Sequence, residues 1–329
     1  MKKLIAMACA VMLCYGVFAQ DKNFKEEAAS GYKGKFIPGI RYYENGFNFI
    51  VIGDWGRTGE YYQKDVAAQM SYAAVSLDPE FIITTGDNFY PYGVASVHDP
   101  LWKSSFEDIY YQFSLQKEWY VTLGNHDYSG NPDAQIEYSK ISRRWVLPSR
   151  YYAKKFMIDD DPQQQVLIVF MDTNPFIRKY YTDPYYGPKV STQDSTAQKK
   201  WMDSVLNDNT VKWKFVVGHH PLYSGGKRIE APETKDMNGS FRHLFEKHKV
   251  DAYICGHEHH LEYTKPAGAT HYFISGGGSE VRPVKKHPDG GKFASASHGF
   301  MTFSLTGNKM LVQVIDHLGK ILYRTEIKK

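Results

Sequence analysis

The sequence predicts an α/β fold whose core sheets are largely parallel. Short apolar runs recur along the chain, and each stops near a glycine that is followed by a polar residue. Segments with the apolar spacing of amphipathic helices separate these runs. The last thirty residues instead alternate apolar and polar side chains around Gly307-Asn308 and Gly319, which is typical of antiparallel hairpin strands. This strand-helix order followed by hairpins is the basis of the prediction.

Five apolar runs are rich in β-branched and aromatic residues, which favours buried strands. They span residues 49–52, 81–83, 120–123, 215–217 and 252–255. The polar residues that follow them are Asp54, Asp87, Asn125, His219 and His257. Because open α/β sheets bind ligands beyond the carboxyl ends of their strands, we expect these five side chains to converge on one crevice.

Three segments carry apolar residues at helical spacing. The first comprises Tyr62, Val66, Met70, Ala73 and Leu77. The second comprises Trp102, Phe106, Ile109 and Phe113, and it follows Asp99-Pro100, a cap with a first-turn proline. The third comprises Met237, Phe241, Leu244 and Phe245. The predicted hairpin strands of the tail span residues 300–305, 310–315 and 320–327.

The first twenty residues have the pattern of a signal peptide. Lys2 and Lys3 precede an almost wholly apolar run over residues 4–18, and Val-Phe-Ala at 17–19 suits cleavage. The run is shorter than the roughly 20 residues that span a bilayer, so no membrane anchor is expected. The cysteines of this segment lie in no convincing lipoprotein motif. We therefore expect a secreted or periplasmic protein.

Beyond residue 20 the chain is expected to form a polar, loosely packed leader over 21–46 and one catalytic domain over 47–329. The sequence is 42 % apolar and 23 % charged, which excludes a disordered chain. Its net charge of +4 with no run of five basic residues argues against nucleic acid as a partner. Cys255 is the only cysteine after the signal segment, so no intrachain disulfide is possible, and we interpret it as a buried strand residue.

The residues at the strand ends are oxygen and imidazole donors. Tyr90 and His259 lie within three residues of this set and bring the candidate ligands to seven, and His126 follows Asn125 directly. Such donors suit zinc, iron or manganese. Seven candidate ligands are too many for one tetrahedral ion, whereas two ions that share a bridging carboxylate use them naturally. A pair of metals is the usual clamp for hydrolysis of phosphate esters.

Five motifs resemble those of the calcineurin-like metallophosphoesterases, and more closely those of the purple acid phosphatases, which include the tartrate-resistant acid phosphatases. They are G-D-W-G at 53–56, G-D-N-F-Y at 86–90, G-N-H-D at 124–127, V-G-H-H-P at 217–221 and G-H-E-H at 256–259. Tyr90, three residues after Asp87, is the most discriminating. The resemblance covers residues 47–305 and implies a four-layer αββα sandwich, with two mixed sheets face to face and helices on both outer faces.

The resemblance also implies a role for each site residue. The implied ligands of a ferric ion are Asp54, Tyr90 and His259. The implied ligands of a divalent ion, which is iron, zinc or manganese, are Asn125, His219 and His257. Asp87 is implied to bridge the two ions, and His126 to face the leaving-group oxygen without binding metal. The implied activity is that of an exported acid phosphatase, in which a metal-activated hydroxide attacks a small phosphomonoester.

Two other functions stay open at this point. A phosphodiesterase or nucleotide pyrophosphatase uses the same pair of metals. A non-catalytic surface module or a redox di-iron protein is the alternative from another class.

One segment and two further residues are candidates for a supporting role at the site. The segment 222–228 lacks the second substrate-facing histidine of the animal enzymes, so either Lys227 or Arg228 serves as a phosphate-side cation or the loop is merely solvated. Asp127 is a candidate to orient His126. Asp172 is interpreted as a turn-stabilising residue or as support for the site.

Overall fold

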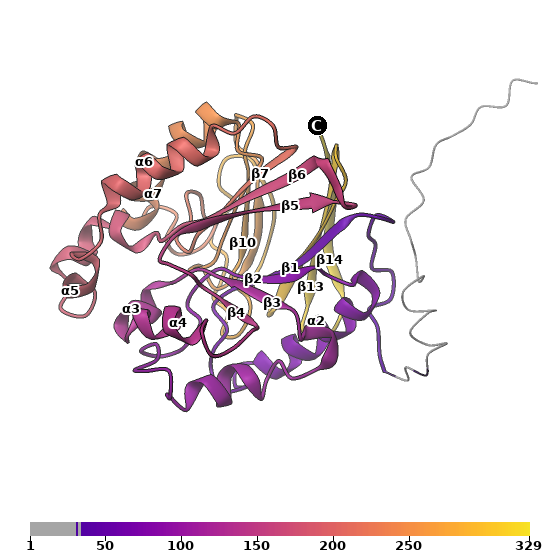
Figure 1. Ribbon diagram of the computed structural model, residues 1–329, viewed down its shortest axis with the longest axis horizontal. Coiled ribbons are helices and arrows are strands. Elements are labelled where there is room, and N and C mark those ends of the chain that lie inside the picture. Colours follow the sequence, from indigo (N-terminus) through magenta and orange to yellow (C-terminus); the bar gives the residue numbers. More distant parts are fainter. Residues whose placement is uncertain (1–30, 32–33) are drawn as a thin grey trace, which may run out of the picture.

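The computed structural model describes residue 31 and residues 34–329, and its core is a pair of β-sheets (Figure 1). The expected signal peptide and residues 21–30, 32 and 33 of the leader lie outside the described residues, so the signal peptide stays a prediction. Among the described residues, no helix is both long enough and apolar enough to cross a membrane.

The first sheet has the strand order β14-β13-β12-β1-β2-β3-β4. Its strands are β1 (Phe47–Ile52), β2 (Phe81–Thr84), β3 (Glu118–Val121), β4 (Trp145–Val146), β12 (Gly299–Leu305), β13 (Lys309–Asp316) and β14 (Ile321–Lys328). β1 to β4 run parallel, and the C-terminal strands β12 to β14 join them as an antiparallel meander on β1. The parallel core and the hairpin tail predicted from the sequence are both confirmed in this sheet.

The second sheet has the order β11-β9-β10-β8-β7-β6-β5. Its strands are β5 (Tyr152–Ile158), β6 (Asp161–Phe170), β7 (Trp213–Val217), β8 (Ala252–Cys255), β9 (Leu261–Thr264), β10 (His271–Ser275) and β11 (Gly291–Ser295). β6, β7, β8 and β10 are parallel, while β5, β9 and β11 are antiparallel to their neighbours. Both sheets are therefore mixed, as the predicted sandwich requires.

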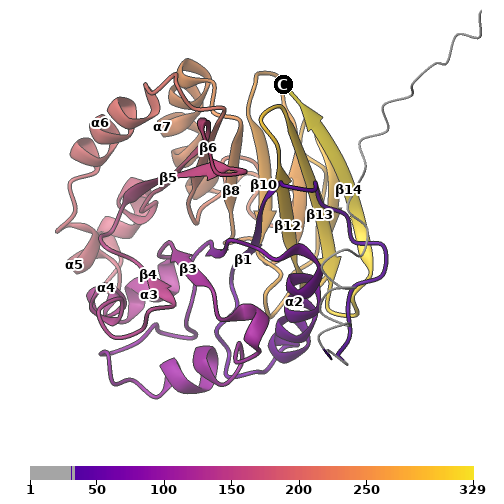
Figure 2. The same cartoon turned by 45° about the vertical axis from the view of Figure 1, so that its right-hand side comes forward.

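Helices cover the outer face of each sheet. The α-helices are α2 (Gln63–Leu77), α3 (Asn125–Ser129), α4 (Pro132–Tyr138), α5 (Gly187–Val190), α6 (Ser195–Leu206) and α7 (Pro232–His248). The short helices are η1 (Trp102–Glu107), η2 (Phe113–Leu115), η3 (Asn174–Phe176) and η4 (Arg178–Thr182). Helix α2 lies against the first sheet, whereas α6 and α7 lie on the far side of the second (Figures 1 and 2). The four-layer αββα architecture is confirmed.

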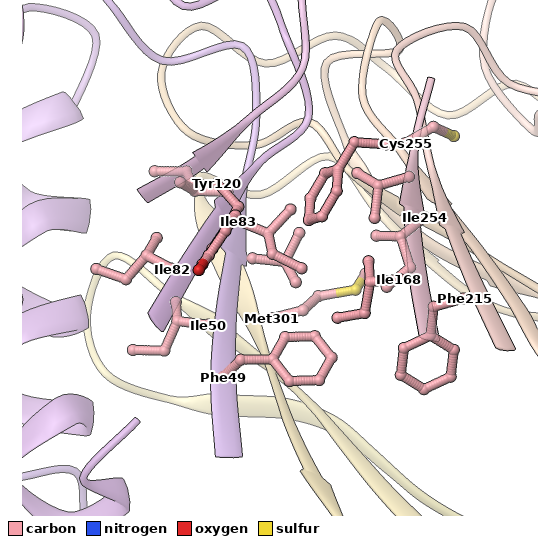
Figure 3. Packing of buried hydrophobic residues seen from close by; sticks show 14 of the residues in the cluster. Phe49, Ile50, Ile82, Ile83, Tyr120, Ile168, Phe215, Ile254, Cys255 and Met301 are labelled. Carbon is pink, nitrogen blue, oxygen red and sulfur yellow. The ribbon is translucent and has the colours of Figure 1, made fainter. Parts of the chain in front are cut away.

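The inner faces of the two sheets meet in an aromatic and aliphatic core (Figure 3). Phe49 of β1 lies 6.0 Å, between ring centroids, from Phe215 of β7, and Phe273 of β10 lies 5.4 Å from Phe303 of β12. All four rings are fully buried. Each buried phenyl ring of this kind contributes about 2 kcal/mol of hydrophobic stabilisation, so the contact fixes how the two sheets sit against each other. Cys255 belongs to the same core, as expected.

The helix predicted from Trp102 to Phe113 is wrong in its second half. The chain forms one π-helical stretch, η1, and then leaves the helix, so that Phe113 begins a separate short helix and is 61 % exposed. The carbonyl oxygen of Tyr110 accepts a hydrogen bond of 2.8 Å from the Arg144 guanidinium instead of one from a following backbone N–H. The buried arginine thus ends the helix where apolar spacing alone predicts that it continues.

The leader is also packed more firmly than expected over its described part, residues 34–46. Ile37 and Ile40 are buried in the core. The backbone N–H of Arg41 donates to Gln313 of β13, and that of Tyr43 donates to Ser304 of β12. The polar composition of the segment misled the prediction, because a few apolar side chains and backbone hydrogen bonds suffice to fix it on the first sheet.

Candidate metal centre

The predicted strand ends supply the site, and both sheets contribute. Asp54 and Asp87 follow β1 and β2, and Asn125 opens α3 just after β3. His219 and His257 follow β7 and β8 of the second sheet. The carboxyl ends of these parallel strands meet along one side of the sandwich, so residues more than 200 positions apart come into contact: the backbone N–H of His257 donates to the carboxylate of Asp54.

A first ligand group surrounds the Tyr90 phenol. Its oxygen lies 3.2 Å from Asp54 Oδ1, 3.1 Å from Asp87 Oδ2 and 3.2 Å from His259 Nε2. Tyr90 and these three partners are almost completely buried. A phenol carries one proton and can donate it to only one of the two carboxylates. The remaining lone pairs of the phenol and the carboxylates have no proton to share, and a bound cation would satisfy them.

A second ligand group is built from imidazoles. His219 Nε2 lies 3.2 Å from His257 Nδ1, and it also lies 3.3 Å from Asp87 Oδ2. Asp87 Oδ2 therefore touches both groups, which is the position of a bridging ligand. Within the described part of the chain, the buried Oδ1 atom of Asn125 and Nε2 atom of His257 have no hydrogen-bond partner. Because orphaned buried acceptors are rare in folded proteins, these atoms also fit a bound ion.

The electrostatics of the first group favour a cation as well. Burial, and then the neighbouring Asp87, raise the pKa of Asp54 to about 7. Burial opposes ionisation of Asp87 too, but the charges of His219 and His126 outweigh it and lower the pKa of Asp87. Burial and both carboxylates raise the pKa of Tyr90 well above its usual value. The phenol can become a phenolate here only if a strongly Lewis-acidic ion replaces its proton.

The pKa of His219 is shifted in the opposite direction from those of His257 and His259. Burial disfavours the charged form of His219, but Asp87 outweighs it and raises the pKa of His219 to about 9. Burial lowers the pKa of His257 and of His259, and the charges of Arg228 and Arg282 act in the same direction. A neutral imidazole is the form that binds metals. The two histidines of the G-H-E-H motif are therefore ready to act as ligands.

Three of the residues that we expect to be ligands have a left-handed backbone conformation. Asp54, Asp87 and His257 have φ angles of 59°, 51° and 68°. Residues other than glycine rarely adopt this left-handed backbone conformation, which costs on the order of 1 kcal/mol or more per residue. Such strain clusters at functional sites, and here it aims each side chain out of its strand into the shared pocket. The loop of the G-H-E-H motif is consequently bent at His257.

Two glycines of the motifs allow the strand ends to approach the carboxylates. A Cβ atom on Gly124 would lie 2.1 Å from Asp87 Oδ1, and one on Gly256 would lie 2.3 Å from Asp54 Oδ2. Any side chain at either position would displace a predicted ligand. Both positions therefore require glycine for close approach of the backbone to a carboxylate.

His126 lies beside the site and not within either group. Its ring centroid lies 4.4 Å from that of Tyr90, and its Nδ1 lies 2.6 Å from the carbonyl oxygen of Pro91. Its backbone N–H donates to Asp87 Oδ1. Asp127 does not orient the ring, contrary to the suggestion from sequence. Its carboxylate instead accepts hydrogen bonds from the backbone N–H groups of Gly124 and Asn88 and from other nearby donors.

His220, which follows a predicted ligand, and Asp172, which follows β6, both have hydrogen-bond partners within the protein. His220 lies with His219 and His257, but its Nδ1 is 2.7 Å from Thr173 Oγ1 and its Nε2 is 2.7 Å from Tyr180 Oη. Both of its ring nitrogens therefore have protein partners. Asp172 stabilises its turn as expected, because its Oδ1 accepts from the backbone and side chain of Asn174, and it also contacts Tyr128.

Sequence reasoning missed two arginines and a tyrosine at the rim of the site. The Arg57 guanidinium lies 3.8 Å above the Tyr90 ring, and Arg282 donates its backbone N–H to the carbonyl oxygen of His259. Tyr186 accepts a hydrogen bond of 3.3 Å from Asn125 Nδ2. Arg57 directly follows the G-D-W-G motif, a position that could have drawn attention. Nothing in the local sequence around Arg282 or Tyr186 marks them.

Comparison with known proteins identifies the class that this fold and site define. Residues 47–261 match the family of calcineurin-like phosphoesterases. Among solved structures, the GAP50 anchor of the inner membrane complex of Plasmodium has the same fold, with a TM-score of 0.75 and 22 % identity over 86 % of this chain and 89 % of that one.

Curated relatives narrow the class. Purple acid phosphatase 7 of Arabidopsis thaliana is 35 % identical over 305 residues, which cover 87 % of each chain. Human tartrate-resistant acid phosphatase type 5 is 32 % identical over 305 residues, which cover 85 % of this chain and 90 % of that protein. The chain belongs to the calcineurin-like phosphoesterases and, within them, to the purple acid phosphatases. The resemblance stated from the five motifs is thereby confirmed.

Proposed function

We propose that the protein is an exported acid phosphatase that hydrolyses phosphomonoesters at a binuclear metal centre. The observation that carries the proposal is the Asp87 carboxylate, which lies between the Tyr90 phenol and the His219 imidazole. Carboxylate, phenol and imidazole groups packed at this distance without a cation would leave several buried lone pairs unsatisfied. The purple acid phosphatase relatives supply the reaction class.

The seven predicted ligands divide into two sets. Those proposed to hold a ferric ion are Asp54, Tyr90 and His259. Those proposed to hold a divalent ion of iron, zinc or manganese are Asn125, His219 and His257. Asp87 is proposed to serve both. When bound, the two ions supply the Lewis acidity that activates water and offsets the charge of the phosphate.

His126 is proposed to assist the leaving group. Hydrogen bonding of Nδ1 to the Pro91 carbonyl oxygen leaves Nε2 as the nitrogen that can reach a substrate. A protonated imidazole at this position transfers its Nε2 proton to the departing alkoxide oxygen. His126 is partly exposed, so its ring is accessible to a substrate from solvent.

The first test is the metal content and visible spectrum of the purified protein. We expect two metal ions per chain and an absorption band from tyrosinate-to-iron charge transfer. Turnover of 4-nitrophenyl phosphate is then measured from pH 4 to 8, with the Asp87→Asn variant as the control for metal dependence. Absence of metal-dependent turnover at every pH would contradict the proposal.

The same assay separates the alternative activity. Bis(4-nitrophenyl) phosphate is the matched diester, and a preference for it above tenfold in kcat/KM would favour a phosphodiesterase. Export is tested separately by N-terminal sequencing of protein recovered outside the cytoplasm. We expect the mature chain to begin near residue 20, and an intact N-terminus would contradict the signal peptide.

A further inference from the structure

Four cationic side chains gather beside the candidate metal centre, and the proposed reaction does not use them. We call them the cationic cluster: Arg57, Lys227, Arg228 and Arg282. They come from three segments that are far apart in the sequence, namely the loop after β1, the loop before α7 and the segment between β10 and β11. Such convergence of like charges is unfavourable unless something negative offsets it.

Two members flank the first ligand group. Arg57 lies over the Tyr90 ring, and Arg282 is tied to His259 by its backbone. Both guanidinium groups share one carboxylate, since Glu280 lies 2.6 Å from Arg57 Nη2 and 3.8 Å from Arg282 Nε. The single carboxylate of Glu280 therefore offsets the charges of two guanidinium groups.

A third member, Arg228, flanks the second ligand group. Arg228 Nη1 donates to the carbonyl oxygen of His257 at 3.0 Å. Its nearest carboxylates are those of Glu258 at 3.7 Å and Glu233 at 3.9 Å, and Glu233 is already paired closely with Lys179. The charge of Arg228 is thus only loosely compensated.

Lys227 is the exposed member of the cluster. In the part of the chain that the structure describes, no carboxylate lies within the 4.0 Å of an ion pair from its ammonium group. Partial burial, and then the charges of Arg282 and Arg228, lower the pKa of Lys227. The ammonium group therefore lies in the field of two guanidinium groups without a partner of its own.

We propose that the cationic cluster binds a carboxylate of the substrate, so that the enzyme favours phosphomonoesters that carry a carboxylate near the scissile phosphate. This inference rests on the proposed phosphatase function. The exposed position of Lys227 leaves its ammonium group accessible to a ligand from solvent, beside Arg228 and the two predicted ligand groups. Guanidinium and ammonium groups bind such oxyanions through charge-assisted hydrogen bonds.

The test compares 2-phosphoglycerate with glycerol 2-phosphate, which differ by a carboxylate in place of a hydroxymethyl group. The quantity measured is the ratio of their kcat/KM values. We expect the ratio to exceed 5 in the wild type and to fall three- to tenfold in Lys227→Gln and in Arg282→Gln. It should also fall with added salt, because exposed charges are screened.

Lys320→Gln, which removes an exposed lysine in the turn between β13 and β14, is the matched control and should keep the wild-type ratio. Metal content of two ions per chain in each variant shows that the centre is intact. A wild-type ratio of 1 or less would overturn the inference. So would variants that lose activity equally on both substrates, because the residues would then serve the scissile phosphate or the fold.

Binding measurements separate this inference from the proposed function. Titration calorimetry of the metal-loaded protein with each ligand gives an affinity ratio that needs no turnover. Tighter binding of 2-phosphoglycerate that is lost in Lys227→Gln, without any hydrolysis, would overturn only the phosphatase. Hydrolysis of both esters with equal affinities would overturn only the cationic-cluster inference.

Discussion

At the scale of single residues, the Tyr90 phenol is the most informative group of the molecule. It lies within 3.2 Å of two carboxylates and an imidazole, all of them buried. A phenolate donates charge strongly to a ferric ion, whereas the same set without it is an ordinary carboxylate and histidine site. The preference of the first ligand group for a ferric ion, as proposed above, therefore depends on the phenol oxygen of Tyr90.

Replacement of Tyr90 by Phe removes that atom and nearly preserves the volume of the side chain. We expect the variant to lose the visible absorption band and to bind iron less tightly. Tyr138→Phe is the control, since this tyrosine is buried on α4 with its ring stacked on Trp102. Retention of the band in Tyr90→Phe, measured by absorption spectroscopy at known iron content, would contradict the assignment.

His126 gives a second prediction at this scale. Replacement by Asn removes the proton donor, and general acid catalysis is worth about 100-fold or more for poor leaving groups. We expect kcat to fall about 100-fold on an alkyl phosphate and much less on 4-nitrophenyl phosphate, whose leaving group needs no proton. Steady-state kinetics on both substrates measure this difference. An equal loss on both would show that His126 acts in some other way.

At the scale of elements, the strand-end loops are held together by Asp127. Its buried carboxylate accepts from Gly124 at the start of α3, from Asn88 and Phe89 in the loop after β2, and from Gln135 of α4. One side chain thus fixes the relative positions of two loops that carry three predicted ligands. Its role is to hold the site together and not to take part in chemistry.

Asp127→Ala would leave several buried donors without an acceptor. We expect the free energy of unfolding to fall by about 3 kcal/mol, the loss typical of a buried charged acceptor with more than one donor. Urea denaturation followed by fluorescence measures it. The control is Glu137→Ala, which removes an exposed carboxylate of α4, and similar stability of the two variants would contradict the role of Asp127.

The elements also show what the sequence could and could not predict. Periodicity and glycine punctuation located all five strands that lead into the site, because burial on both faces and sharp strand ends leave a clear local signature. The end of η1 escaped prediction because it depends on Arg144, which is more than 30 residues away. Arg282 and Tyr186 were missed for the same reason, since their positions at the site come from tertiary contacts.

At the scale of the whole molecule, the candidate centre joins the two sheets. Asp54, Asp87, Tyr90 and Asn125 come from the first sheet, whereas His219, His257 and His259 come from the second. An ion held by both sets links the inner edges of the sandwich. Such binding stabilises the folded state, because the unfolded chain offers no preformed site.

Removal of the metal ions should therefore lower the melting temperature. We expect a fall of roughly 5–15 °C after chelation and dialysis, the size that binding well above its dissociation constant gives in a domain of this length. Differential scanning calorimetry measures the shift, and added iron and zinc should reverse it. The melting temperature of Asp87→Asn should change little on chelation. An unchanged melting temperature of the chelated wild type would contradict the stabilisation of the fold by bound metal.

Acid stability is a further property of the whole molecule, and His271 at the start of β10 contributes to it. Burial, and then the charge of Lys265, lower its pKa to about 4 from the usual 6.5. Between these two pH values the folded protein binds fewer protons than the unfolded chain, so stability rises with pH. We expect the urea midpoint to rise less steeply from pH 4 to 6.5 in His271→Gln than in the wild type. Parallel curves for the two proteins would contradict this contribution.

The division of the ligands between the sheets also sets an order of events during biosynthesis. A nascent chain that has been made only as far as residue 200 contains both aspartates, the phenol and the amide, but none of the three imidazole ligands. A complete coordination sphere therefore cannot form until translation has passed His259 and β8 has docked beside β7. If the proposed ligands hold the metal ions, loading is restricted to chains whose halves have already assembled, and products truncated before His219 would lack the complete centre.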